Sequence, residues 1–299
     1  MSPRALWPGL LLAVLGAIGF SGKAIIVKLA YRHGVDAVTL LMWRMLLALP
    51  FFLAMAWWAG RDKPALTRQD WRDIAVLGFT GYYLASYLDF AGLAYISASL
   101  ERLILYLNPT LVLLLSVVFF HHKLQARQVV ALAISYAGVV AVFAHELSFE
   151  GRSTAMGAAL VFASAISYAI YLALSGKVVQ RLGSLRLAGL ASSVACALCI
   201  AQFALLKPMS AFIVPEPVMW LSLLNATACT VAPVLMVMLA IARVGAPLSS
   251  QVGMVGPMST ILMGVLILGE PMNAWIALGT ALVMVGVFLV STRKNGSAR

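Results

Sequence analysis

The stretch that decides the fold runs over Pro109–Val142 and reads PTLVLLLSVVFFHHKLQARQVVALAISYAGVVAV. It returns 148 residues further along, over Pro257–Val290, as PMSTILMGVLILGEPMNAWIALGTALVMVGVFLV. The two copies align without a gap, and 8 of their 34 positions are identical, including Pro109 with Pro257. Each proline removes a backbone donor inside an apolar stretch, so we expect both to kink a helix.

The repeat extends over the rest of the chain. A shift of 149 residues brings Lys28 onto Lys177, in the earlier part of each half. We therefore expect two repeats of similar length, the first at residues 1–146 and the second at residues 147–299.

The composition requires lipid as the solvent. Of the 299 residues, 63% are hydrophobic and 10% are charged, and the mean hydropathy is +0.98. A soluble domain cannot bury that much apolar surface. The apolar stretches of spanning length are Leu6–Tyr31, Val38–Trp58, Trp71–Tyr95, Ser97–Phe120, Gln128–Ala144, Met156–Leu174, Leu185–Leu206, Val218–Ile241, Leu248–Leu268 and Trp275–Val290.

These ten stretches predict the fold class. Each repeat holds five of them, an odd number, so the second repeat must lie inverted in the membrane. We therefore predict an all-α integral membrane protein with ten transmembrane helices in two inverted five-helix repeats, an architecture typical of alternating-access carriers. The spans leave no room for a soluble catalytic domain, so we do not expect an enzyme.

The basic residues predict the orientation. The net charge is +11. With the N-terminus inside, fourteen Lys and Arg residues fall on the cytoplasmic side and three, Arg32, Arg152 and Lys207, on the other. This bias follows the positive-inside rule and places both termini of a multi-pass inner-membrane protein in the cytoplasm. The basic excess is thus a topology signal and does not indicate a nucleic-acid partner.

Several charges lie inside the predicted spans, where an ionised side chain is costly and marks a candidate functional site. Lys28 has a charged counterpart in the second repeat and lies near a helix end, so we expect it to be structural. Five others face uncharged counterparts and converge on the outer third of the membrane: Lys23, Arg44, Asp89, Glu101 and Arg102.

Two interpretations of the five charges remain open. They can form buried ion pairs that only hold helices together, such as Arg44 with Asp89 and Arg102 with Glu101. Alternatively, they line a polar cavity in which Asp89 or Glu101 carries protons. The spare positive charge would then suit an anionic group on a small-molecule substrate.

Aromatic side chains on helix faces are further candidates for the cavity wall, namely Tyr82, Tyr168 and Tyr171. Such stripes also serve plain helix packing. His121 and His122 have no further metal ligands at suitable spacing, and no phosphate-binding glycine loop is present. We therefore expect neither a metal nor another cofactor, and no ATP-driven pump.

At this point the chain resembles the drug/metabolite transporter superfamily, in its EamA-type branch. The resemblance rests on Lys28, on Arg44 in LLMWRMLLALP, on the run YISASLERLILYLNPTLVLLLS, and on LILGEPMNAWIALGTALVMVGVFLV with its Gly269-Glu270 pair. It implies ten helices in two inverted repeats, a central cavity, and a secondary carrier of small metabolites in the cytoplasmic membrane, often an exporter. One departure is that the first repeat has His121-His122 where the second has Gly269-Glu270.

The expected function is therefore secondary active export of small polar metabolites, such as amino acids or related compounds, by alternating access. Protons are the candidate coupling ion. An importer with the same fold, and a non-transporting scaffold or a channel, remain open alternatives. The sequence does not distinguish a monomer from a homodimer.

Overall fold

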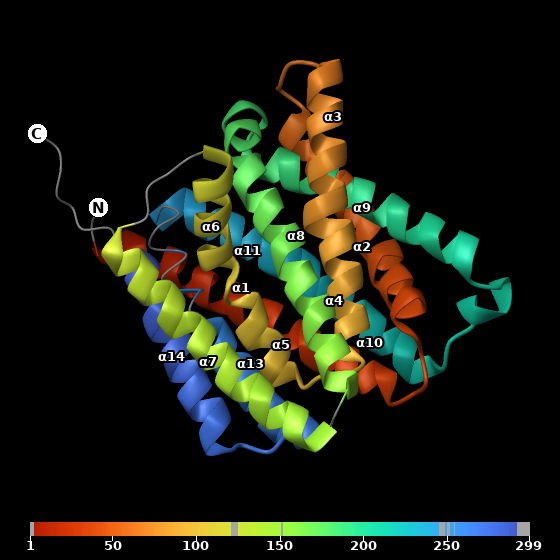
Figure 1. Ribbon diagram of the computed structural model, residues 1–299. Helices are drawn as coiled ribbons and strands as arrows, with labels where there is room; N and C mark the ends of the chain where they lie inside the picture. Colours follow the sequence, from red (N-terminus) through yellow and green to blue (C-terminus); the bar gives the residue numbers. More distant parts are fainter. Residues whose placement is uncertain are drawn as a thin grey trace, which may run out of the picture.

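The computed structural model describes residues 3–120, 125–150, 152–244, 249, 252–253 and 255–291, and this part of the chain is helical without strands (Figure 1). The elements of the first half are α1 (Pro3–Tyr31), α2 (Ala37–Gly60), α3 (Arg68–Leu77), η1 (Gly78–Leu84), α4 (Ala85–Leu93), α5 (Ala98–Leu105), α6 (Asn108–Phe120) and α7 (Ala126–Glu150). Those of the second half are α8 (Arg152–Leu182), α9 (Ser184–Leu206), η2 (Met209–Phe212), α10 (Glu216–Ala226), η3 (Thr227–Val231), α11 (Ala232–Val244), α13 (Val255–Met263), η4 (Gly264–Leu268) and α14 (Ala274–Ser291).

The helices have the length and composition that a membrane requires. Seven of the described helical segments are long and apolar enough to span a bilayer, and two shorter apolar helices cover Val255–Leu268 and Ala274–Leu289. The remaining predicted span is the unbroken run of α3, η1 and α4. The prediction of an all-α integral membrane protein is therefore confirmed, and helices lie at all ten predicted positions.

Three of the segments labelled η are π-helical, namely η1, η3 and η4, and two of them, η1 and η3, lie at equivalent places in the two repeats. η1 begins at Gly78 and η3 begins at Thr227, which are 149 residues apart. A π-helical turn widens the helix and frees backbone groups, and such turns are frequent at functional sites. The repeat is thus visible in local backbone geometry as well as in sequence.

The fourth span is broken ahead of its proline. α5 ends at Leu105, α6 begins at Asn108, and Pro109 lies in the first turn of α6. Proline is well suited to a first helical turn, because its missing N–H has no partner there in any case. Pro257 lies in α13, and residues 252–253 ahead of it are helical as well.

The packing of the helices follows the repeat (Figure 1). α7 lies along α14 and α2 lies along α9, so the fifth span meets the tenth and the second meets the seventh. α1 packs on α11 and α13, and its counterpart α8 packs on α4, α5 and α6. The main helix contacts of one half therefore have equivalents in the other half.

The crossing of α7 and α14 shows this relation at atomic detail. A Cβ on Gly138 would lie 2.7 Å from the carbonyl oxygen of Gly279, and one on Gly286 would lie 2.7 Å from that of Ala131. The shift of 148 residues that maps Gly138 onto Gly286 also maps Ala131 onto Gly279. Both contacts need a glycine because the backbones touch directly.

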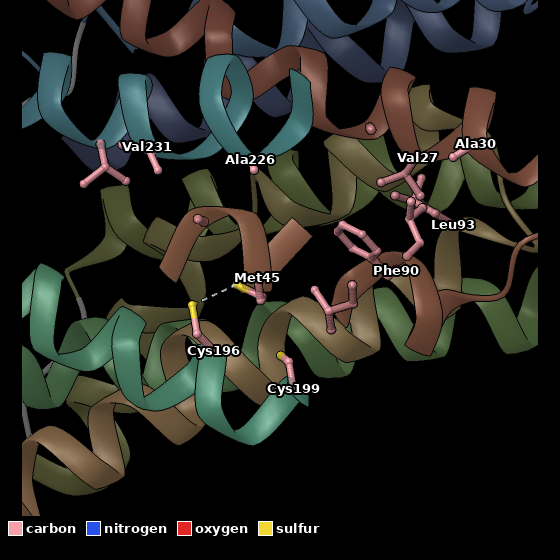
Figure 2. Close-up of a cluster of buried hydrophobic side chains, with 14 of the residues drawn as sticks. Val27, Ala30, Met45, Phe90, Leu93, Cys196, Cys199, Ala226 and Val231 are labelled. Atoms are coloured by element: carbon pink, nitrogen blue, oxygen red, sulfur yellow. Dashed lines mark hydrogen bonds between the residues drawn. The ribbon is translucent and has the colours of Figure 1, made fainter. Parts of the chain in front are cut away.

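The largest buried core joins α1, α2, α4, α9 and α10 (Figure 2). Its labelled members include Val27, Met45 and Phe90, and the thiol of Cys196 contacts the Met45 sulfur at 3.8 Å. Cys196, Cys199 and Cys229 are all buried and free. This core holds α1 and α4 together at the depth where the charged residues lie.

Candidate functional site

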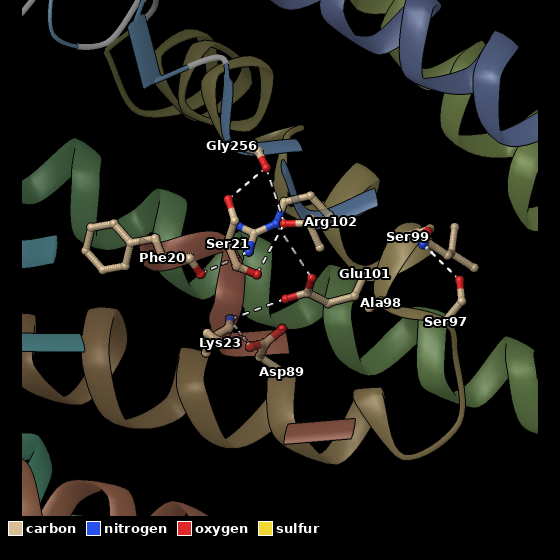
Figure 3. Close-up of polar contacts among 12 residues, drawn as sticks. Phe20, Ser21, Lys23, Asp89, Ser97, Ala98, Ser99, Glu101, Arg102 and Gly256 are labelled. Carbon is tan, nitrogen blue, oxygen red and sulfur yellow. Dashed lines mark hydrogen bonds and ion pairs between the residues drawn. The ribbon is translucent and has the colours of Figure 1, made fainter. Parts of the chain in front are cut away.

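Four of the five predicted charges meet in one place. Lys23 of α1 donates a hydrogen bond to Asp89 of α4, and its Nζ lies 3.3 Å from Oε1 of Glu101 on α5. Arg102 Nε lies 3.9 Å from Oε2 of Glu101. Figure 3 shows the Lys23 ammonium between the two carboxylates. We call Lys23, Asp89, Glu101 and Arg102 the charge cluster.

The charge cluster is buried but only partly satisfied. Asp89 is 2% exposed and Glu101 is 0% exposed. Among the described residues, Oδ1 of Asp89, both oxygens of Glu101 and Nε of Arg102 have no hydrogen-bond partner. Buried polar atoms in folded proteins are nearly always hydrogen-bonded, so this concentration of exceptions calls for an explanation.

Local structure places the Glu101 carboxylate. Ser97 is the N-cap of α5, and its hydroxyl accepts a hydrogen bond from the Leu100 N–H at 3.0 Å. Glu101 therefore lies in the first turn of α5, where the helix dipole favours a negative charge. Arg102 turns away from the helix axis and donates to the carbonyl of Phe20 in α1 at 3.2 Å.

α1 packs closely against its neighbours on either side of Lys23. A Cβ on Gly22 would lie 2.9 Å from the Cys229 sulfur of η3. The hydroxyl of Ser21 donates to the carbonyl of Gly256 at 2.7 Å, which joins α1 to α13 (Figure 3). Lys23 is thus held at the junction of the two repeats.

Arg44 lies beside the charge cluster but does not pair with Asp89, whose partner is Lys23. Arg44 is 7% exposed, and its Nε donates to Thr230 Oγ1 at 2.9 Å. Its guanidinium carbon lies 5.2 Å from the centre of the Phe90 ring, so a cation–π contact supports it. Within the described part of the chain, its guanidinium nitrogen Nη1 has no hydrogen-bond partner.

The second-repeat partners of Arg44 were not predicted from the sequence. The hydroxyl of Thr230 accepts from Arg44 and in turn donates to the carbonyl of Asn225 at 2.7 Å. Asn225 is 0% exposed, and both polar atoms of its side chain lack a hydrogen-bond partner in the described structure. A lone asparagine inside an apolar span was the signal that could have singled it out.

The three predicted tyrosines form a separate group, which we call the tyrosine cluster. The hydroxyls of Tyr82 and Tyr171 lie 3.1 Å apart, and the rings of Tyr168 and Tyr171 stack at 5.4 Å between centroids. They pack with Ile74 and Val178 in a core between α3, η1, α8 and α9. The structure therefore does not bring the tyrosines and the charge cluster into one hydrogen-bonded site.

A cavity of about 450 Å³ opens at the end of the bundle that the charge pattern predicts to face outward. Its lining includes Lys28, Arg32, Ile96, Ser97 and Glu270. Lys28 Nζ donates to the carbonyls of Leu93 at 3.3 Å and Ile96 at 2.9 Å, so this lysine ties α1 to the end of α4.

The candidate metal ligands do not gather into a site within the part of the chain that the structure describes. There, no group of three or more His, Cys, Asp or Glu side chains is arranged to hold an ion. His121 and His122 lie outside the described residues.

Comparison with known proteins decides the family. The model of the EamA-like transporter family matches residues 7–144 and again residues 155–292. The chain belongs to the EamA-like transporter family. The resemblance drawn from the sequence is therefore confirmed, and two matches in one chain agree with a repeated membrane fold.

Relatives of this EamA-like transporter carry general names. One is "Uncharacterized transporter YcbK" of Bacillus subtilis (strain 168), 28% identical over 297 residues, which are 95% of this chain and 91% of the relative. Another is an "Uncharacterized transporter" of Archaeoglobus fulgidus, 24% identical over 292 residues, which are 95% of this chain and 98% of that one. The EamA-like chain is thus a multi-pass membrane transporter.

A solved structure shows the same fold. It is named only as "Crystal structure of protein", and it superposes with a TM-score of 0.65, at 17% identity, over 97% of this chain and 96% of that chain. At this identity the likeness concerns the EamA-like fold alone.

Proposed function

We propose that the protein is a secondary active exporter of small polar metabolites, such as amino acids or related compounds, in the cytoplasmic membrane. Residues 1–146 and 147–299 are the two inverted repeats, and both termini lie in the cytoplasm. Rocking of one repeat against the other exposes a central site to each side in turn. The family and the transporter names of the relatives support the class of function.

The observation that carries the proposal is the incomplete pairing of the charge cluster. A cluster that only held helices together would gain by satisfying its buried atoms, because each unsatisfied charged atom is costly. Two carboxylates, Asp89 and Glu101, instead share Lys23. Atoms without partners can bind a proton or a polar group of a substrate.

The arrangement separates the roles of the two carboxylates. Asp89 accepts a hydrogen bond from Lys23, whereas the basic neighbours of Glu101 lie further off, at 3.3 and 3.9 Å. Protonation of Glu101 therefore weakens longer contacts than protonation of Asp89 does, so Glu101 is the proton carrier. Arg44, with an unpartnered Nη1 in the described structure, is the group that meets an anionic part of the substrate.

Purified protein in lipid vesicles tests this function, with radiolabelled amino acids as the first probes. A carrier saturates and shows counterflow, a channel passes solute without saturating, and a scaffold moves nothing. Imposed pH gradients of either sign then show whether protons drive movement and in which direction substrate moves.

The variant that sharpens the test is Glu101→Gln. It should lose movement driven by a pH gradient and keep exchange of substrate for substrate, because the amide cannot release a proton. Asp89→Asn is the matched carboxylate control and should keep more of the gradient response. Normal gradient-driven movement by Glu101→Gln would refute the role of Glu101.

A further inference from the structure

One carboxylate outside the charge cluster crosses between the repeats. Glu270 follows η4 in the second repeat, and Oε1 accepts a hydrogen bond from the Ala98 N–H at 2.7 Å. Oε2 accepts from the Ser99 N–H at 3.2 Å and from the Ser99 hydroxyl at 2.7 Å. A single side chain of the second repeat thus holds the first turn of α5 in the first repeat.

The chain around Glu270 is shaped to present this carboxylate. Gly269 has a positive φ of 73°, and the Glu270 N–H donates back to the carbonyl of Gly264 at 3.0 Å. A Cβ on Gly264 would lie 2.9 Å from Oε2 of Glu270 and 3.6 Å from the Ser99 hydroxyl. Any side chain at position 264 would therefore push on the carboxylate.

Other contacts close the same end of the bundle. Arg32 at the end of α1 donates to the carbonyl of Leu268 at 2.8 Å, and Lys28 donates to the carbonyls of Leu93 and Ile96. The 450 Å³ cavity lies among these groups. Glu101 is two residues beyond Ser99 on α5, so a movement of the α5 N-terminus moves the charge cluster as well (Figure 3).

The repeat lacks this carboxylate at the opposite end. The shift of 148 residues places His122 at the position of Glu270 and His121 at that of Gly269. An imidazole carries no negative charge and cannot act as an anionic helix cap. The aligned position of the first repeat therefore supplies no carboxylate of this kind.

We propose that Glu270 is a latch that keeps the outer end of the transporter closed beneath the cavity, and that its release from the α5 N-terminus opens a path from the cavity to the charge cluster. Hydrogen bonds to an ionised carboxylate are stronger than neutral ones, and here they act across the interface of the repeats. An anionic cap at one end only favours the conformation that is closed outward and open inward. This inference rests on the proposed function for the existence of two such conformations.

Thiol labelling tests the latch. The three native cysteines are first replaced by alanine, and Ile96→Cys then places a thiol at a cavity-lining position that is 1% exposed. A membrane-impermeant maleimide is added to intact cells. Labelling should be slow with the latch intact and at least about tenfold faster in Glu270→Ala, the factor expected when one charge-assisted hydrogen bond is lost. Glu270→Gln should lie between the two.

Gly264→Ala displaces the Glu270 carboxylate without replacing it and should also speed labelling. Its matched control is Gly176→Ala, because a Cβ on Gly176 meets nothing within 4 Å. Ala94→Cys, exposed at the cavity rim, reports the sidedness and should react equally in every background. Size-exclusion chromatography confirms that each variant is folded.

The outcomes separate the two proposals. Equal labelling of Ile96→Cys in the parent, Glu270→Ala and Gly264→Ala would overturn the latch. Latch-dependent labelling in a protein that moves no solute in vesicles would keep the latch and reject the transport proposal. Labelling of Ala94→Cys only in inside-out vesicles would overturn the outer placement of the latch.

Discussion

The charge cluster and the tyrosine cluster consist of polar residues buried inside apolar helices, yet they are built differently. The charge cluster joins α1, α4 and α5 and, among the described residues, leaves Asp89 Oδ1 and both Glu101 oxygens without hydrogen bonds. In the tyrosine cluster the hydroxyls of Tyr82 and Tyr171 meet at 3.1 Å, and Tyr168 stacks on Tyr171. Polarity and burial are shared, so hydrogen-bond satisfaction is what separates a candidate site from packing.

The largest expected effect is that of Lys23→Ala. It leaves Asp89 without its hydrogen bond and Glu101 without its nearer cation. Removing one partner of a buried ion pair costs about 3–5 kcal/mol, so we expect a large fall in thermal stability together with loss of transport. Thermal melting in detergent and vesicle flux measure the two effects.

The double variant Lys23→Ala/Asp89→Ala is the informative control. It should recover part of the stability, because the uncompensated carboxylate is gone, but should not recover transport. If the double variant transported normally, the charge cluster would be a packing device like the tyrosine cluster.

An intermediate effect is expected for Gly81→Ala, which disturbs the packing of the tyrosine cluster. A Cβ there would overlap the ring of Tyr171. Overpacking a filled core costs about 1–3 kcal/mol, so the melting temperature should fall while substrate affinity in the folded fraction stays the same. Gly176→Ala, in open space, should not lower it. A selective loss of affinity in Gly81→Ala would place the tyrosines in the transport site.

The smallest effect is expected for Tyr82→Phe. The substitution removes one hydrogen bond between two hydroxyls and keeps the ring contacts. A loss of about 0.5–1.5 kcal/mol in stability should follow, with flux unchanged. Binding of a probe amino acid, followed as a rise in melting temperature, checks whether the hydroxyl contributes to recognition.

The repeated part of the architecture was accessible from the sequence. Apolar stretches of spanning length and short connections place the ten helices, and the gapless alignment of Pro109–Val142 with Pro257–Val290 reveals the repeat. The convergence of Lys23, Asp89, Glu101 and Arg102 was predictable because their depth follows from helix rise alone.

The sequence did not allow the pairing of residues within the site to be predicted in the same way. Depth does not say which faces of two helices meet, so the sequence suggests a pair of Asp89 with Arg44, whereas the structure pairs Asp89 with Lys23. Arg44 reaches Thr230 only because α2 packs beside η3 of the other repeat. The capping of α5 likewise joins Glu270 to Ala98 and Ser99, which are 172 and 171 positions away in the sequence. No local sequence pattern predicts such a contact.

The crossing of α7 and α14 has a consequence for the origin of such a chain. Each side of the crossing supplies both a glycine and the carbonyl that meets the other glycine, in the manner of an isologous interface between identical subunits. Two copies of one half-length protein would already fit each other at this surface. Joining two such copies into one chain would leave a crossing of this geometry, with each half then free to specialise.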